Sequence, residues 1–308
     1  MPDSSPLSEA DTNAPQSAPD RLLAGAIDCH VHIGPEPFQE RRVDTVTLAL
    51  EAREAGMRAM VIKSHYYCTA PVAHLVNQIV PDFSLVGSLT LNGGAGGLNP
   101  EVVDAAVEIG ARVVWMPTYS SMPDIRRRAE GKRYPVGTTT NVPISGISLL
   151  ASDGKLVPHM MSILEIMKGN NVALATGHVS VPESYAVTAE ARRMGIEVII
   201  THPLSESTGS RLSLEQQQEL AALGAYIEYT FVPCMPSSQQ MNPAVMVEHV
   251  KAIGLEHCIL TTDFGQDANP PPPEGFRMML ATMLRLGLSE RELHTLVKTN
   301  PARLLGLD

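Results

Sequence analysis

The sequence predicts an α/β fold, and more narrowly a (β/α)8 barrel of the TIM type. Short apolar runs rich in β-branched residues alternate with amphipathic stretches along most of the chain, a pattern typical of parallel strands joined by crossover helices. The alternation fills about eight strand–helix units over about 250 residues, the size of one such barrel. A doubly wound open sheet is the alternative, but it usually contains fewer units.

The predicted strands follow one another at regular intervals. Several helical stretches begin with proline, whose missing N–H costs nothing in the first turn, and end at a glycine just before the next strand. The strands are expected at Ala26–His32, Met57–Ser64, Ser84–Leu91, Ala111–Thr118, Val172–His178, Glu197–His202, Ala225–Phe231 and Cys258–Asp263. Helices are expected at Val43–Ala55, Pro100–Gly110, Pro158–Lys168, Pro182–Met194, Leu214–Leu223 and Pro243–Ile253.

Two long segments interrupt this rhythm, and each follows a strand. Residues 119–157 form a loop insertion after the fourth strand, with a hairpin expected between Ile147–Leu150 and Lys155–Val157. Phe264–Glu274 follows the eighth strand and contains four consecutive prolines. Long loops at the carboxyl ends of barrel strands usually act as lids or substrate walls.

The chain is expected to form a single domain with an N-terminal extension. Residues 1–22 are rich in Pro, Ser, Asp and Ala and show no apolar periodicity, so we predict a disordered or loosely attached arm there. Residues 23–308 then make up the barrel.

The composition narrows the classes of function. The chain has 308 residues and a formal net charge of −10, which argues against binding to nucleic acid or to an anionic membrane surface. No apolar run approaches the roughly 18 residues that span a bilayer, and no signal-peptide pattern opens the sequence. The four cysteines have no paired spacing and indicate a reducing compartment. We therefore expect a cytoplasmic protein that acts on a small molecule.

The first predicted strand ends in a His-x-His motif. His30 and His32 are two residues apart, so in a strand they lie on the same face. Two neutral imidazoles at the end of a buried strand form half of a metal site. A single motif of this kind is weak evidence, so the interpretation depends on the other strand ends.

Polar side chains also close most of the other predicted strands. Because the carboxyl ends of barrel strands surround the active site, we expect these side chains to converge on one cavity. Each also has a structural interpretation: Asp263 could cap a helix, and Lys63 could reach solvent. The residues are Lys63 and His65 on the second strand, His178 on the fifth, His202 on the sixth, Glu228 on the seventh and Asp263 on the eighth.

This set of strand ends resembles the amidohydrolase superfamily of metal-dependent hydrolases. In that superfamily the first strand supplies His-x-His, the fifth and sixth strands each supply a His, and the eighth supplies an Asp. The closing segment NPARLLGL, residues 300–307, is also similar to the ending of many members. The resemblance spans residues 25–308 and implies a divalent metal in the mouth of a barrel, with Zn favoured.

Carried over by position, the resemblance implies a role for each strand-end residue. Asp263 and His202 would be the catalytic residues, Asp263 as proton acceptor of the metal-activated water and His202 as an acid/base or as ligand of a second metal. The implied metal ligands are His30, His32, His178 and Asp263. The expected substrate-binding residues are Lys63, His65 and Glu228.

The chain departs from binuclear members of the superfamily at the fourth strand. Those members carry a carboxylated lysine, a Glu or a Cys there, whereas this strand ends in residues 114–118 without such a group. One metal ion is therefore favoured over two. Lys63 lies on the second strand and would approach from a different direction if it were carboxylated. With His65, it is interpreted as an anchor for a substrate carboxylate or as a group that polarises the substrate carbonyl.

Three functions stay open. The first is hydrolysis of a small amide, lactone or ester bond by metal-activated water. The second is decarboxylation of an unsaturated carboxylic acid, as in the similar aminocarboxymuconate-semialdehyde decarboxylase branch, which uses one metal. The third is a catalytically dead barrel that serves as a binding protein, although the intact ligand set argues against it. We expect a homo-oligomer, since barrels of this kind often pair.

Overall fold

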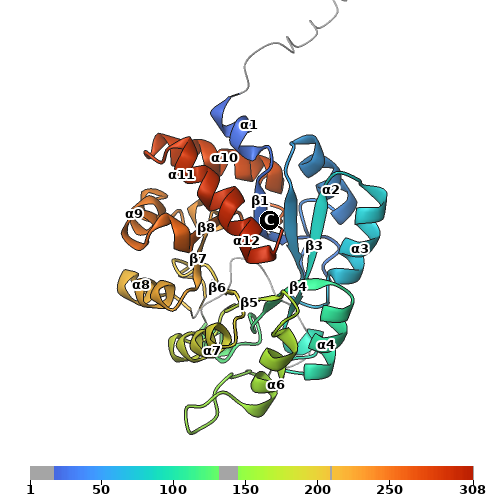
Figure 1. Cartoon of the computed structure of the whole chain (residues 1–308), viewed down its shortest axis with the longest axis vertical. Coiled ribbons are helices and arrows are strands. Elements are labelled where there is room, and N and C mark those ends of the chain that lie inside the picture. The colour runs from blue at the N-terminus through green and yellow to red at the C-terminus, as the bar shows by residue number, and fades with distance from the viewer. Residues whose placement is uncertain (1–16, 132–144, 209, 308) are drawn as a thin grey trace, which may run out of the picture.

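The computed structural model describes residues 17–131, 145–208 and 210–307. Within them, eight parallel strands follow one another in chain order and curl into a nearly closed barrel with helices around it (Figure 1). The predicted (β/α)8 fold is therefore confirmed. The strands are β1 Ile27–His32, β2 Ala59–Lys63, β3 Ser84–Thr90, β4 Ala111–Trp115, β5 Ala173–Ala175, β6 Val198–Ile200, β7 Tyr226–Thr230 and β8 Cys258–Thr261.

The barrel closes between its first and last strands through backbone hydrogen bonds. The amide of Asp263 donates to the carbonyl of His30 at 2.9 Å, and the amide of His32 donates to the carbonyl of Phe264 at 2.7 Å. A parallel bridge joins Val31 to Phe264. Closure therefore places the end of β1 directly beside the residues that follow β8.

The helices that the sequence predicts are present, with ends that differ by one or two residues. The structure also contains helices outside those stretches, two of them beside or within the long loops. The predicted helices are α2 Thr45–Glu54, α4 Pro100–Glu108, α6 Pro158–Met167, α7 Val181–Arg193, α8 Leu214–Ala222 and α9 Ala244–Ile253. The others are α1 Ala18–Leu23, α3 Ala70–Ile79, α5 Met122–Ala129, α10 Pro272–Arg285, α11 Glu290–His294 and α12 Asn300–Leu305.

Apolar side chains fill the barrel and the space between strands and helices. A small cluster of strand residues that includes Trp115 lies in the interior, and α12 adds Leu304 to it. The Asn300 side chain donates to the carbonyl of Cys258, the first residue of β8, at 2.8 Å. The closing segment of the chain therefore covers the amino-terminal end of the barrel and leaves the carboxyl-terminal end open.

Helix α1 lies within the arm that the sequence predicts. It begins after Ser17 and packs against α10 and α11, and its residues Leu22 and Leu23 are buried. The folded domain therefore begins no later than Ala18, earlier than the predicted residue 23, because α1 has apolar residues to bury. Residues 1–16 lie outside the described residues, so the arm itself stays a prediction.

The two long loops contain more structure than expected. Helix α5 lies in the insertion after β4, whose residues 132–144 lie outside the described residues. Where a hairpin was predicted, Leu150 and Leu156 form a single antiparallel bridge. The loop after β8 is shorter than predicted, because α10 begins at Pro272 and uses two of the four prolines in its first turn.

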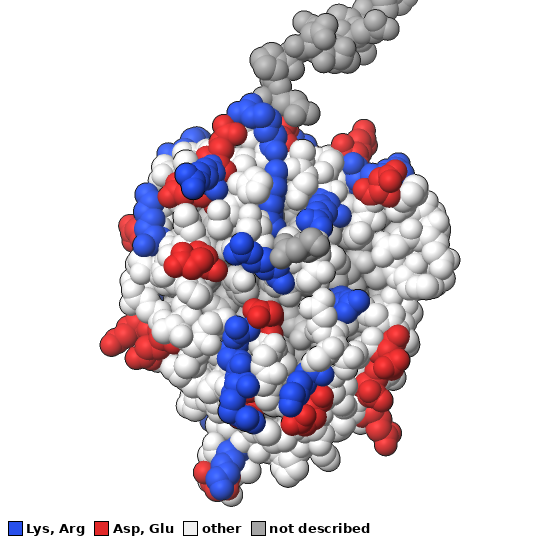
Figure 2. Space-filling model, in the orientation of Figure 1, with Lys and Arg blue, Asp and Glu red and all other residues white. Residues whose placement is uncertain are grey.

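Acidic and basic side chains are interspersed on the face shown in Figure 2. Among the described residues, no helix is long and apolar enough to cross a membrane. All four cysteines are free thiols.

Candidate metal centre

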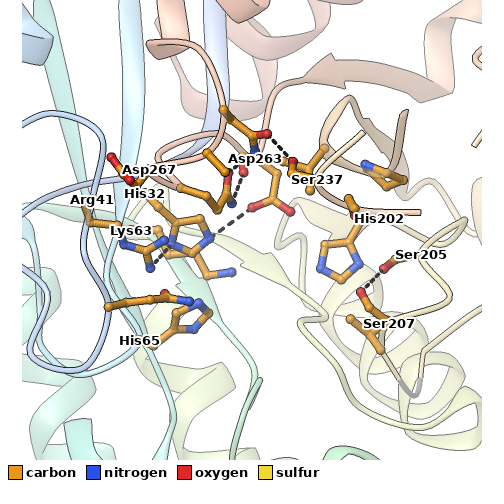
Figure 3. Close-up of a pocket in the computed structure, with 18 of the residues that line it drawn as sticks. His32, Arg41, Lys63, His65, His202, Ser205, Ser207, Ser237, Asp263 and Asp267 are labelled. Atoms are coloured by element: carbon orange, nitrogen blue, oxygen red, sulfur yellow. Dashed lines mark hydrogen bonds and ion pairs between the residues drawn. The ribbon is translucent and has the colours of Figure 1, made fainter. Parts of the chain in front are cut away.

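A cavity of about 500 Å³ opens at the carboxyl ends of the strands (Figure 3). Two further predicted residues, His30 and Glu228, are fully buried behind its wall. The structure therefore brings the predicted strand-end residues into one region. Those that line the cavity are His32, Lys63, His65, His178, His202 and Asp263.

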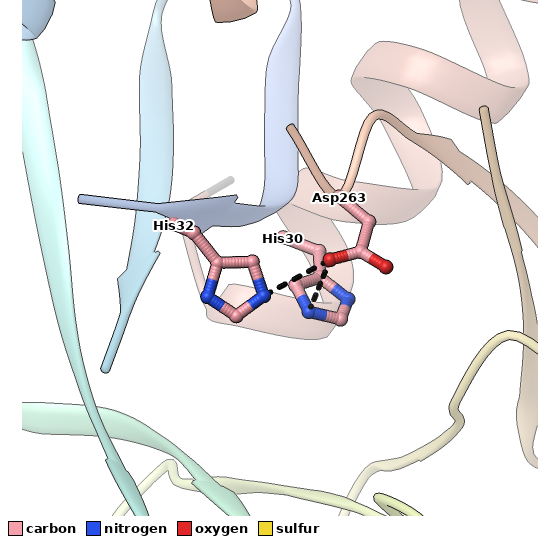
Figure 4. A group of neighbouring side chains, drawn as sticks. All are labelled: His30, His32 and Asp263. Carbon is pink, nitrogen blue, oxygen red and sulfur yellow. Dashed lines mark ion pairs between the residues drawn. The ribbon is translucent and has the colours of Figure 1, made fainter. Parts of the chain in front are cut away.

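His30, His32 and Asp263 form a compact group at one side of this cavity (Figure 4). Oδ1 of Asp263 lies 3.2 Å from Nε2 of His30 and 3.0 Å from Nε2 of His32. One ligating atom from each residue lies within 4.8 Å of the others. Asp263 has a left-handed backbone, with φ of 57°, and its amide takes part in barrel closure. The same backbone contact that closes the barrel thus assembles a group that could hold a divalent ion.

Glu228 orients the ring of His30. Nδ1 of His30 lies 3.3 Å from each carboxylate oxygen of Glu228, and the amide of His202 donates to Glu228 at 3.2 Å. A histidine that donates its Nδ1–H to a carboxylate presents the Nε2 lone pair to a metal. Glu228 was expected to bind substrate, but it does not line the cavity, because β7 turns it behind His30. We therefore assign it the orienting role.

A second carboxylate, Asp124, contacts His178 in the same manner. Its Oδ2 lies 2.6 Å from Nδ1 of His178, and the Asp124 side chain is fully buried. Nε2 of His178 lies 3.2 Å from Nε2 of His202. Sequence reasoning missed Asp124 because it stands three residues after the helix cap Ser121, where an acidic residue is ordinary.

Lys63 and His65 lie on the neighbouring part of the wall. Nζ of Lys63 lies 3.0 Å from Nε2 of His30 and 4.2 Å from the ring centre of Trp115. The His65 ring stacks on Tyr119, and its Nδ1 lies 2.9 Å from Oγ1 of Thr118. Trp115 is the last residue of β4, and sequence reasoning did not foresee its contact with Lys63.

Burial determines the charge states in the cavity. It lowers the pKa of His30 to about 3 and raises the pKa of the Asp263 carboxyl above its ordinary value. The histidines are therefore neutral near pH 7 and can offer lone pairs to a metal. Burial likewise lowers the pKa of four more histidines well below the ordinary value, namely His32, His65, His178 and His202.

Most residues of this site lie in a segment of the chain that matches a known protein family. Residues 25–228 match the family described as "Family of unknown function (DUF6282)". The chain belongs to this family. The segment that matches DUF6282 includes the His-x-His motif and Glu228 but ends before Asp263. Among curated proteins, none matches the chain.

Solved structures share the fold of this DUF6282 protein. An amidohydrolase from Pseudomonas aeruginosa aligns with a TM-score of 0.63 and 13% identity over 93% of this chain and 98% of its own. A probable dipeptidase from the same organism gives 0.62 and 11%, over 94% and 96%. A probable 2-pyrone-4,6-dicarboxylic acid hydrolase from Acinetobacter baumannii, with citric acid bound, gives 0.57 and 13%, over 92% and 99%. The resemblance to amidohydrolases is therefore confirmed at the level of the fold.

Proposed function

We propose that this DUF6282 protein is a metal-dependent hydrolase of a small-molecule amide, lactone or ester bond. The observation that carries the proposal is the group of His30, His32 and Asp263 at the wall of a cavity of about 500 Å³. Buried carboxylates behind His30 and His178 support it, because they leave Nε2 of each ring available as a ligand.

The donor set fits a divalent metal ion. Imidazole nitrogen and carboxylate oxygen are ligands that zinc accepts, and zinc is the ion we favour. His178 is proposed as a further ligand, since Asp124 orients it as Glu228 orients His30. One ion is favoured over two, because β4, described over its whole length, ends at Trp115 without a bridging group. When bound, such an ion lowers the pKa of a coordinated water toward about 7 and polarises a carbonyl group.

Asp263 and His202 are proposed to move protons. Burial raises the pKa of Asp263, and a carboxylate with a raised pKa accepts a proton more readily and can return it to a leaving group. His202 lines the opposite part of the cavity as a neutral imidazole. Its Nδ1 is buried without a hydrogen-bond partner among the described residues, and its Nε2 lies 3.2 Å from Nε2 of His178.

The named activities of the structural neighbours support hydrolysis as the class of reaction. They describe an amidohydrolase, a probable dipeptidase and a probable hydrolase of a pyrone dicarboxylic acid. Those activities belong to the neighbours. For this chain, we use them to choose the bond types to be assayed, which are amides, peptides, esters and lactones.

The proposal is tested by replacing Asp263 with Asn in zinc-loaded protein. Asn tolerates the left-handed backbone of this position, so Asp263→Asn removes the proton acceptor and keeps the local fold. Turnover of a panel of small lactones, esters and amides is expected to fall by at least about 100-fold while zinc stays bound. Asp153→Asn is the matched control, because the Asp153 side chain is 58% exposed and lies outside the cavity lining.

Two results would count against the proposal. Normal turnover by the Asp263→Asn variant would remove the proposed role of the carboxylate. Release of carbon dioxide from an unsaturated carboxylic acid, without hydrolysis of any panel member, would favour the decarboxylase alternative.

A further inference from the structure

Arg41 is a buried cation in the cavity wall to which the proposed chemistry gives no role. Its side chain is 2% exposed, and it lines the cavity beside His32 (Figure 3). Arg41 forms an antiparallel bridge with Gln266, and the amide of Arg42 donates to the carbonyl of Gly265 at 2.9 Å. The loop after β1 is thereby tied to the loop after β8, so the guanidinium is presented by the same two segments that carry the metal ligands.

The protein partners of Arg41 leave part of its guanidinium unsatisfied. Glu36 Oε2 lies 3.5 Å from Nη2 of Arg41, at the long limit of a hydrogen bond. Among the described residues, neither Glu36 Oε2 nor Nε of Arg41 has a hydrogen-bond partner, although both atoms are buried. Arginine offers five N–H donors in a planar fork that matches a carboxylate. A bidentate anion in the cavity would satisfy donors that the protein leaves unpaired.

The contact between Arg41 and His32 and a metal on His32 would exclude each other. Nη2 of Arg41 lies 3.3 Å from Nδ1 of His32. Because a guanidinium can only donate, Nδ1 must accept, and the ring proton is then on Nε2. If His32 held a metal through Nε2, its proton would be on Nδ1. Nδ1 could then no longer accept from Arg41, and, in the part of the chain that the structure describes, Nη2 would have only Glu36 beside it.

The other groups around the cavity are less suited to bind an anion. Lys63 is directed at Nε2 of His30, and His65 is neutral and in contact with Thr118. The wall across from Arg41 is neutral and rich in hydroxyl groups, among them those of Ser205, Ser207 and Ser237 (Figure 3). Besides Asp263, the acidic residues of the lining are Glu40 and Asp267, and both are exposed.

We propose that Arg41 binds a carboxylate group of the substrate. The substrate is then a small carboxylic acid whose bound carboxylate lies a few bonds from the carbonyl that is hydrolysed. This inference rests on the proposed function, since it places the acid relative to the metal. Arg41 thus takes the place of Lys63 and His65, which the sequence predicts as the anchor for an anionic group.

Calorimetric titration of zinc-loaded protein with unreactive acids tests the proposal. Acetohydroxamate binds zinc and has no carboxylate, whereas malonate, succinate, glutarate and adipate can place one carboxylate on the metal and the other on Arg41. In Arg41→Gln, the affinity for the tightest dicarboxylate is expected to fall at least about tenfold. The affinity for acetohydroxamate is expected to change by less than about twofold. Arg41→Lys keeps the charge without the fork and should give an intermediate loss.

Arg42→Gln is the matched control, because the Arg42 side chain is 46% exposed and the variant should bind every acid as the wild type does. Equal dicarboxylate affinity in wild type and Arg41→Gln would overturn the proposal. An equal loss for acetohydroxamate and the dicarboxylates would overturn it as well, since it would indicate a general disturbance of the cavity. The zinc content of the same samples is measured as well. If the wild-type protein does not bind zinc, the result contradicts the proposed function and the inference that rests on it. If the protein binds zinc but Arg41→Gln shows no selective loss of dicarboxylate affinity, the result contradicts the inference alone.

Discussion

Asp124 and Glu228 contact the sides of His178 and His30 that face away from the cavity. Each carboxyl group is fully buried and lies within about 3.3 Å of a ring Nδ1, so a neighbour and not solvent acts on the tautomer of each histidine. A carboxylate that contacts the far nitrogen of a metal-binding histidine holds the orientation of the ring and raises the basicity of the nitrogen that binds the metal. We therefore expect metal affinity to depend on residues that do not touch the metal.

Substitution of Asp124 tests this dependence. Asp124→Ala removes the acceptor for Nδ1 of His178, and Asp124→Asn keeps an acceptor without the charge. The zinc affinity, measured by competition with a chelator, is expected to fall about 10–100-fold in Asp124→Ala and less in Asp124→Asn. Asp153→Asn, in an exposed part of the same insertion, is the control. Unchanged zinc affinity in Asp124→Ala would show that His178 is not a ligand or does not need its carboxylate.

The sequence predicts some of these residues and not others for a physical reason. His30 and His32 stand at the end of an apolar strand with a period of two, so their shared face follows from the spacing. Asp124 and Arg41 lie in segments without periodicity. Their positions depend on how α5 and the loop after β1 fold back over the barrel mouth, which no local pattern encodes.

At the scale of elements, barrel closure and site assembly depend on the same backbone contact. His30 and Asp263 are hydrogen-bonded through their main chains, and Gly265 follows two residues later with a φ of 132°. A Cβ atom at Gly265 would lie 2.1 Å from the carbonyl oxygen of His32. The close approach of β1 to the loop after β8 therefore requires a residue without a side chain.

Gly265→Ala is expected to destabilise the protein and the metal site together. The clash with a backbone atom and the strained φ should lower the free energy of unfolding by about 2–4 kcal/mol, and zinc affinity should fall because His32 is displaced. The control is Gly154→Ala, where φ is also positive, at 79°, but a Cβ meets nothing within 4 Å. It should cost about 1 kcal/mol. Denaturant unfolding measures both variants, and equal stability of the two would contradict the role given to Gly265.

Strand positions could be predicted from the sequence, whereas strand ends could not. The polar residues His65, His178, His202 and Asp263 follow the strands in the structure and do not belong to them. Their backbones leave the ladder to direct side chains into the cavity, and two of them, His202 and Asp263, have positive φ. A functional requirement thus overrides the local strand pattern at the point where the site begins.

At the scale of the whole molecule, the number and order of units determine the architecture. Regular alternation predicts a barrel because eight strand–helix units over about 250 residues match its size, whereas a doubly wound open sheet usually has fewer units. The same alternation says nothing about the substrate, since specificity depends on loops. The insertion after β4 shows this, because it supplies a buried carboxylate to the site from a segment that the sequence predicts as a loop with a hairpin.

Metal content tests the central claim most directly. Protein purified without added metal or chelator is analysed by elemental mass spectrometry, beside a folded His30→Ala/His32→Ala variant. We predict about one equivalent of a divalent ion, zinc first, per wild-type chain, and its loss in the double variant. A folded wild-type protein without metal, or a double variant that keeps the same metal, would contradict the account.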